Sequence, residues 1–144
     1  MFRFRPLKVD EIKKMEVAGQ IVAETLKLIG KNIKVGVETL ELDRLAEDFI
    51  RSKNAKPAFK NYNGFPYTLC ISIDEEIVHG FPSKRKLEEG QIVSIDCGAE
   101  IDGYFGDSAV TFSVGKISEE KQRLLKITEE SLFAGIEKAV NRGK

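Results

Sequence analysis

The stretch TLCISIDEEIVHGFPSKRKLEEGQIVSIDCGAEIDGYFGDSAVTF, residues 68–112, decides the fold of this chain. It contains the only histidine, His79, both cysteines, and two aspartates, Asp96 and Asp107, that lie within strand-like sequence. Aspartate is depleted in strands, and a carboxylate on a buried sheet face is costly unless it is paired or bound to a metal ion. The two aspartates therefore need an explanation.

A tight turn at Asp102-Gly103 predicts an antiparallel hairpin around these aspartates. Apolar residues alternate with polar or small ones over residues 91–99, and residues 104–114 follow as a second strand. Asp-Gly is a preferred central pair of a two-residue hairpin turn. The turn fixes which residues face each other across the hairpin.

With this turn, Gly98 pairs with Asp107 and Asp96 pairs with Ala109. The two aspartates then share one face as diagonal neighbours, with Cβ atoms roughly 7–8 Å apart. Cys97 falls on the opposite face, in the core. Two carboxylates can converge from such positions on a pair of metal ions, which hydrolases hold about 3.5–4 Å apart, and Gly98 adds no side chain there. On residue types alone, an exposed hairpin whose aspartates face water stays the alternative.

The composition predicts one soluble domain over residues 1–144, with 42% apolar and 32% charged residues. The formal net charge is zero, so no broad attraction to nucleic acid or to an anionic membrane is expected. No apolar run approaches the roughly 20 residues of a membrane span, and the N terminus lacks a secretory signal. The two cysteines show no metal-site or disulfide spacing. A cytoplasmic location is expected.

Helices are predicted before and after the strands along the chain. The first runs from Val9 or Asp10 to about residue 33, and the second covers residues 40–52 with Thr39 as its N-cap. The last follows an N-cap at Ser118, and residues 2–5 form a short strand or an arm. The apolar stripe of the first helix consists of Ile12, Met15, Gly19, Val22, Leu26, Ile29 and Ile33, and that of the last consists of Leu125, Leu132, Ile136 and Val140.

Two further strands complete the pattern. Residues 68–74 alternate as a strand, and residues 77–79 are expected to return as another after a turn at Glu75-Glu76. The segment KPAFKNYNGFPYT, residues 56–68, is rich in Pro, Gly, Asn and aromatic residues and is typical of a shaped loop. The order helix, helix, antiparallel strands, helix indicates an α+β fold, with an antiparallel sheet packed against helices.

These segments resemble the type I methionine aminopeptidases, which have the pita-bread metallopeptidase fold. The resemblance lies in EIKKMEVAGQIVAETL (11–26), KPAFKNYNGFP (56–66), CISIDEEIVHGFP (70–82) and IVSIDCGAEIDGYFGDSAVTF (92–112). Proline dipeptidases share the fold, but the VHGFP segment and the short N-terminal part favour methionine aminopeptidase.

The resemblance implies a role for each site residue. Asp96 would bind one metal ion with both carboxylate oxygens, Asp107 would bridge two ions, and His79 would contact the scissile amide as a catalytic and substrate-binding residue. The ions would be Co, Mn, Fe or Zn, and the reaction would be hydrolytic removal of the initiator methionine from nascent polypeptides. The pocket for the methionine side chain would be lined by Phe59, Tyr62, Phe65 and Cys70.

Each of these residues also has a purely structural interpretation. A lone histidine in a loop is usually a surface residue. Cys70 alternates with core residues, as a small buried hydrophobic side chain would. Tyr62 and Phe65 equally suit aromatic packing of their loop on the sheet.

The sequence departs from the family pattern in two respects. The family's metal cage has two aspartates, one histidine and two glutamates, and the last three come from a second, pseudo-symmetric half that has no counterpart in this chain. The chain therefore resembles an N-terminal half, and we expect a fragment whose site needs the C-terminal half. At Asp74 the family usually has Asn near a monovalent cation, so a cation there is left open.

Two functions from different classes follow from this pattern. The chain is either part of an enzyme whose missing half is supplied by a longer chain or a partner, or a non-catalytic pita-bread half. The non-catalytic half would bind a protein partner, for which the ribosomal exit is a candidate location.

Overall fold

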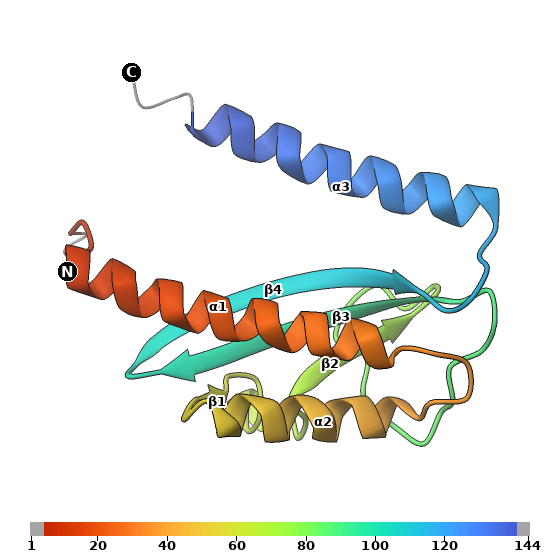
Figure 1. The fold of residues 1–144 in the computed structure, drawn as a ribbon, viewed down its shortest axis with the longest axis horizontal. Helices are drawn as coiled ribbons and strands as arrows, with labels where there is room; N and C mark the ends of the chain where they lie inside the picture. The colour runs from red at the N-terminus through yellow and green to blue at the C-terminus, as the bar shows by residue number, and fades with distance from the viewer. Residues whose placement is uncertain (1–4, 141–144) are drawn as a thin grey trace.

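The computed structural model describes residues 5–140, so nearly all of the predicted N-terminal strand or arm lies outside the described residues. One antiparallel sheet is covered by helices, which confirms the α+β architecture (Figure 1). The elements in chain order are α1 (Val9–Asn32), α2 (Thr39–Ser52), β1 (Lys56–Pro57), the 3-10 turn η1 (Tyr62–Gly64), β2 (Leu69–Ile73), β3 (Ile92–Ile101), β4 (Tyr104–Ser113) and α3 (Glu119–Val140).

The β3–β4 hairpin has the register that the turn residues predict. Asp102 and Gly103 both have positive φ, 52° and 81°, which a two-residue type I′ turn requires. Gly98 pairs with Asp107 and Asp96 pairs with Ala109, so the two aspartates share one face. Cys97 is fully buried on the other face, as predicted.

β3 is the central strand of the sheet. β4 lies along one of its edges, and β2 and β1 lie along the other, all antiparallel to it. The pairing of β2 with β3 sets Cys70 opposite Asp96 and Ser72 opposite Ser94, on the face of the sheet that carries the aspartates. The opposite face is apolar and forms the core with α1 and α2. Its buried residues on β2 and β3 are Leu69, Ile71, Ile73, Val93, Ile95, Cys97 and Ala99.

Helix α1 covers the sheet only from Ala18 onward. A glycine in β4 permits the close approach, because a Cβ atom at Gly106 would lie 2.6 Å from the carbonyl carbon of Ala18. The predicted stripe is therefore wrong at its start: Ile12 and Met15 are 43% and 41% exposed. The first turns of α1 lie beside the end of the hairpin, where Tyr104 approaches them.

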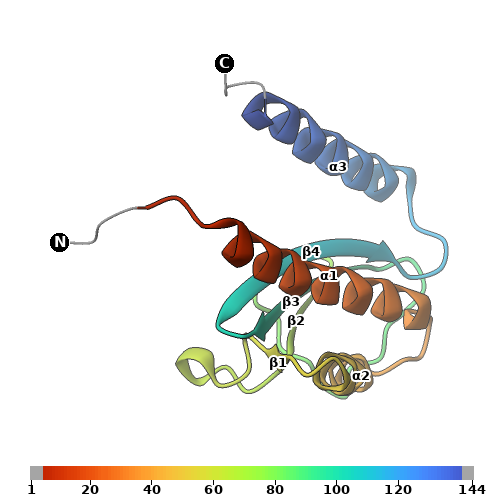
Figure 2. The same ribbon diagram turned by 60° about the vertical axis from the view of Figure 1, so that its left-hand side comes forward.

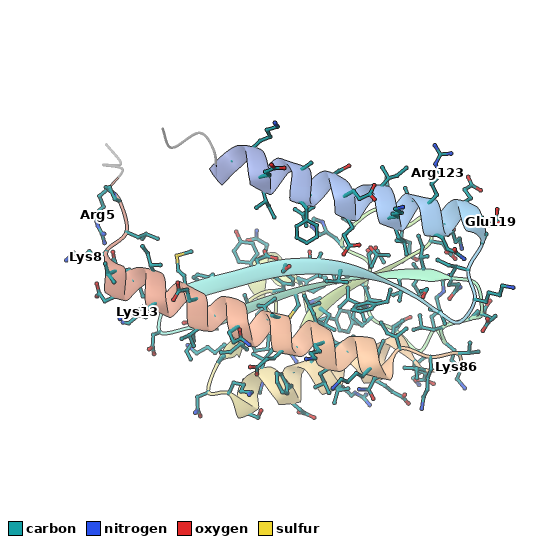
Figure 3. The ribbon with its side chains drawn as sticks, turned by 45° about the horizontal axis from the view of Figure 1, so that its top comes forward. Arg5, Lys8, Lys13, Lys86, Glu119 and Arg123 are labelled. Carbon is teal, nitrogen blue, oxygen red and sulfur yellow. The ribbon has the colours of Figure 1, made fainter. Side chains whose placement is uncertain are left out.

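The start of α1 is held by hydrogen bonds to a carboxylate, and not by packing on the sheet. Glu11 accepts hydrogen bonds from the backbone N–H of Lys8 at 2.7 Å and from both terminal nitrogens of Arg5 at 2.7 and 2.6 Å. The bond from Arg5, followed by that from Lys8, lowers the pKa of Glu11 to about 2. Figure 3 shows Arg5, Lys8 and Lys13 together at this end of the helix.

Helix α2 begins one residue before its predicted start, and Thr39 is not its N-cap. Glu38 occupies that position, without a capping hydrogen bond from its side chain. The Thr39 hydroxyl instead donates to the carbonyl of Ser83 at 3.0 Å and accepts from the N–H of Ser83 at 2.8 Å. The side chain is 2% exposed, so this exchange ties the loop after His79 to the helix.

The strand predicted over residues 77–79 is wrong. These residues are exposed and irregular, and Ile77 is 89% exposed. The free edge of β2 is satisfied by other groups: the Gly80 carbonyl accepts from the N–H of Ile71 at 2.9 Å, and the Glu76 carboxylate accepts from the N–H of Ile73 at 3.0 Å. A side chain therefore takes the bond that a second strand would otherwise make.

Helix α3 runs beyond the edge of β4, away from α1 and α2 (Figures 1 and 2). Its predicted N-cap is confirmed, since Ser118 Oγ accepts from the N–H of Lys121 at 3.2 Å. Arg123 points away from the sheet (Figure 3). Of its predicted apolar stripe, Leu125 is half-buried, Leu132 and Ile136 are 61% and 47% exposed, and the Val140 side chain is outside the described structure.

A hollow of about 660 Å³ separates β4 from α3, lined by Ser108–Thr111 and by residues of the helix such as Leu125 and Phe133. Within residues 5–140, no helix is both long and apolar enough to cross a membrane.

We expect that replacing Asp43 destabilises the fold strongly. Its buried carboxylate on α2 accepts from the N–H groups of Thr68 and Leu69 at 2.9 and 2.8 Å, where β2 begins. Asp43→Ala leaves both donors unsatisfied and should cost about 2–4 kcal/mol in urea unfolding, whereas Asp43→Asn keeps an acceptor and should cost less. Asp48→Ala on the exposed face of α2 is the control. Equal losses for Asp43→Ala and Asp48→Ala would contradict this anchor.

Candidate functional site

One cavity brings together every residue that the sequence nominated for the site. It has a volume of about 450 Å³, a size typical of small-molecule sites. It lies against the face of the sheet that carries the aspartates. The cavity is lined by Phe59, Tyr62, Asn63, Phe65, Cys70, His79, Asp96 and Asp107. Their proximity is a finding, whereas their chemical roles stay predictions.

The carboxylates of Asp96 and Asp107 are held close enough to disturb each other. Burial, then the negative charge and close approach of Asp107, raise the pKa of Asp96 to about 6. Asp96 is half-buried on the central strand, and Asp107 is exposed on the edge strand. Two carboxylates that disturb each other in this way favour a proton or a cation between them.

This carboxylate pair suits part of a divalent metal site. Carboxylate oxygens are hard ligands of the kind that such ions prefer. Within residues 5–140, however, no group of three or more His, Cys, Asp and Glu side chains is placed to hold one ion. The donor set is therefore compatible with metal binding but supplies only part of a coordination shell.

The two cysteines differ in position but are both protonated thiols. Cys70 is 6% exposed and lines the cavity opposite Asp96. Burial, then the charges of Asp96 and Asp107, raises its pKa to about 11. The same causes raise the pKa of the core residue Cys97 to about 12. Since nucleophilic attack needs a thiolate, these raised pKa values disfavour it at both cysteines.

Gly98 makes room for an aromatic ring. A Cβ atom at this position would lie 2.6 Å from the Phe59 ring, so a larger residue would push into it. The Ala58 N–H donates to the Gly98 carbonyl at 2.9 Å and holds this part of the loop on β3. Phe59 therefore reaches the cavity beside the aspartates because the central strand has a glycine there.

The loop over residues 56–68 supplies the aromatic wall, as expected. Phe65 stacks edge-on with Phe81 and Tyr67, at ring-centroid distances of 5.1 and 6.0 Å. Tyr62 is 68% exposed at the rim. Asn63 lines the cavity as well and was missed by the sequence analysis; its φ of 48° before Gly64 is the Asn-Gly turn signal that locates it.

The carboxylate of Asp74 forms an ion pair with Lys121 of α3. Lys121 Nζ lies 2.6 Å from Asp74 Oδ1 and 2.8 Å from the Gly90 carbonyl oxygen. The N–H of Ile92 donates to the same carboxylate oxygen at 3.1 Å. An ammonium group thus lies beside Asp74, the residue at which the sequence analysis left undecided whether a monovalent cation binds.

The chain is similar to a well-defined group of proteins. Residues 13–144 match metallopeptidase family M24. The methionine aminopeptidase of Clostridium acetobutylicum is 58% identical over 131 residues, and methionine aminopeptidase 1 of Bacillus subtilis is 50% identical over 129; each alignment covers 90% of this chain and 52% of the relative.

Solved structures agree with these sequence matches. The crystal structure of methionine aminopeptidase from Rickettsia prowazekii superposes with a TM-score of 0.90 at 36% identity, covering 93% of this chain and 54% of that one. The chain thus spans about half the length of the relatives that it matches.

We expect Asp96 to titrate near pH 6 in the metal-free chain. The measurement is the NMR chemical shift of its carboxyl carbon as a function of pH, in the presence of EDTA. Because the folded state holds this proton more tightly than the unfolded chain, stability should fall as pH rises from about 4 to about 6. Asp107→Asn should lower the midpoint and raise stability at pH 7 by about 1 kcal/mol, since one pKa unit is worth about 1.4 kcal/mol.

The matched control is Asp102→Asn, which changes a carboxylate to an amide at the hairpin turn, where Asn-Gly is also preferred. It should leave the Asp96 midpoint unchanged. An unchanged midpoint in Asp107→Asn would show that the two carboxylates do not interact.

Proposed function

The chain belongs to metallopeptidase family M24, and we propose that it supplies one side of the active site of an enzyme that removes the N-terminal methionine from new polypeptides. It corresponds to an N-terminal half of the methionine aminopeptidases. The observation that carries the proposal is the single cavity in which the paired carboxylates of Asp96 and Asp107 meet His79 and an apolar wall.

Asp96 and Asp107 would hold two divalent ions, for which Co, Mn, Fe and Zn are the candidates. Such ions, when bound, supply Lewis-acid chemistry and an activated water near neutral pH. The contribution of the chain is to present two oxygen ligands on rigid paired strands. Burial and the negative charge of Asp107, which raise the pKa of Asp96, would be offset by the positive charge. The remaining ligands would come from residues beyond those of this chain.

The rest of the cavity would bind the substrate. His79 would contact the scissile amide from the loop after β2. The apolar wall of Phe59, Phe65 and Cys70 suits an unbranched apolar side chain such as that of methionine, which adapts well to irregular apolar pockets.

Lys121 would take the place of a monovalent cation at Asp74. Its ammonium group already contacts a carboxylate oxygen and a carbonyl oxygen at this position. No added monovalent ion should therefore be needed at this position. The interaction also fastens the first turn of α3 to the end of β2.

The second candidate is a non-catalytic module that binds a protein partner, with the ribosomal exit as a candidate location. The observation in its favour is the exposed apolar surface of α3, where Leu132 and Phe133 are each 61% exposed. Such a module would have no need for Asp96, Asp107 and His79 in one cavity, so we favour the enzyme. The substrate of this enzyme would be the initiator methionine of nascent chains in the cytoplasm.

The test is a chimera that joins residues 1–144 to the remaining part of the Clostridium acetobutylicum methionine aminopeptidase. With added Mn or Co, it should release methionine from a Met-Ala-Ser peptide. Asp107→Asn should lower kcat/KM at least about a hundredfold through loss of a metal ligand, and Asp102→Asn should leave it within about twofold. A folded chimera without metal-dependent activity would contradict the proposal.

Residues 1–144 alone should not turn over the peptide. Two carboxylates leave most coordination positions to water, and general acid–base catalysis, typically worth about 10²–10⁴ in rate, would lack its full set of groups. Metal-dependent cleavage by the isolated chain, lost in Asp107→Asn, would contradict the half-site part of the proposal.

Cys70→Phe should narrow the pocket in the chimera. The larger ring would fill part of the cavity, so KM for methionyl peptides should rise about tenfold. Cys97→Ala, a core change on the opposite face, should lower stability by about 1 kcal/mol without changing KM. Unchanged kinetics for Cys70→Phe would remove this residue from the substrate pocket.

A further inference from the structure

The backbone at His79 has an uncommon conformation. Its φ is 59°, in the left-handed region that residues other than glycine seldom adopt, although histidine is enriched among the exceptions. Such conformations persist where the surrounding structure imposes them, and they gather at functional sites. Because the His79 side chain is exposed, its direction depends on the backbone that carries it.

The next residue, Gly80, is fastened to β2 through both its backbone N–H and its backbone carbonyl. Its N–H donates to Ser72 Oγ at 3.1 Å, and its carbonyl accepts from the N–H of Ile71 at 2.9 Å. The contact is so close that a Cβ atom at Gly80 would lie 2.1 Å from the Ile71 carbonyl oxygen. These bonds hold the backbone immediately after His79 against the sheet edge.

Only one of the two bonds depends on a side chain. The bond from Ile71 joins two backbone groups and survives any substitution that keeps the fold. The bond to Ser72 is made by a hydroxyl that is almost fully buried, with the residue 4% exposed. Ser72 lies on the same face of β2 as Cys70, so its side chain is directed toward the side of the sheet that carries the cavity.

We propose that Ser72 is a positioning residue for His79. By accepting the hydrogen bond from Gly80, its hydroxyl keeps His79 at positive φ and its imidazole at the cavity with Asp96 and Asp107. The catalytic part of this inference rests on the proposed function. A purely structural Ser72 would satisfy an N–H group at the strand edge without any effect on the imidazole.

The chain offers a direct readout, because His79 is its only histidine. Labelling residues 1–144 with ¹³C,¹⁵N-histidine gives one set of signals, whose Cα and Cβ shifts report φ and whose ring signals report the environment of the imidazole. Ser72→Ala should shift or broaden these signals. Ser72→Thr, which keeps the hydroxyl, should retain the wild-type pattern.

Ser94→Ala is the matched control. Ser94 lies directly opposite Ser72 on the same face, and its hydroxyl is hydrogen-bonded to Thr111 Oγ1 at 2.9 Å rather than to the loop. It loses the same group from the same sheet and should leave the His79 signals unchanged. His79 signals that are the same in Ser72→Ala as in wild type, or that change equally in Ser94→Ala, would overturn the proposal.

Kinetics of the chimera provide the second arm. Ser72→Ala should lower kcat at least about tenfold with KM within about twofold, since a small misplacement of a group at the reacting bond is costly in rate. An unchanged kcat would overturn the catalytic part. A chimera inactive in every form would count against the proposed function, whereas the NMR result would still decide whether Ser72 positions His79.

Discussion

The turn at Asp102-Gly103 is the constraint on which the rest of the structure depends. Two successive residues with positive φ join β3 to β4 without an extra residue, and this sets the parity of every pair along the hairpin. One face receives Asp96 and Asp107, and the other receives Cys97 and the apolar residues that α1 and α2 cover. A slip of one residue would bury the carboxylates and expose the core, so the core itself enforces the arrangement of the site.

The candidate site is built at a cost to stability. The raised pKa of Asp96 means that the folded chain holds a carboxylate in surroundings that disfavour its charge. At the same cavity, His79 has a backbone conformation that side chains seldom adopt. Strain and like-charge proximity of this kind are expected where a site is prepared for a cation or a substrate. The rigid hairpin and the bonds at the edge of β2 are what keep these unfavourable features in place.

Much of this could be predicted from the sequence, because local rules determine it. The Asp-Gly turn determines the hairpin register, and the family resemblance nominated seven residues that line one cavity. The errors arose where groups outside the regular strand and helix patterns compete for the same bonds. Glu76 and Gly80 satisfy the edge of β2 that residues 77–79 were expected to occupy as a strand, and Ser83 engages the Thr39 hydroxyl. Periodicity extended the buried stripe of α1 to Ile12, although this residue is 43% exposed.

The contact between Gly98 and Phe59 has a consequence for how the site can evolve. The same position of β3 that faces Asp107 across the hairpin also determines how far the aromatic ring can withdraw from the cavity. Any side chain at this position would collide with the Phe59 ring and force it to move. Under the proposed function, this one backbone position would couple the shape of the aromatic wall to the arrangement of the carboxylate pair, and a change in pocket width would have to come from other walls to leave the pair undisturbed.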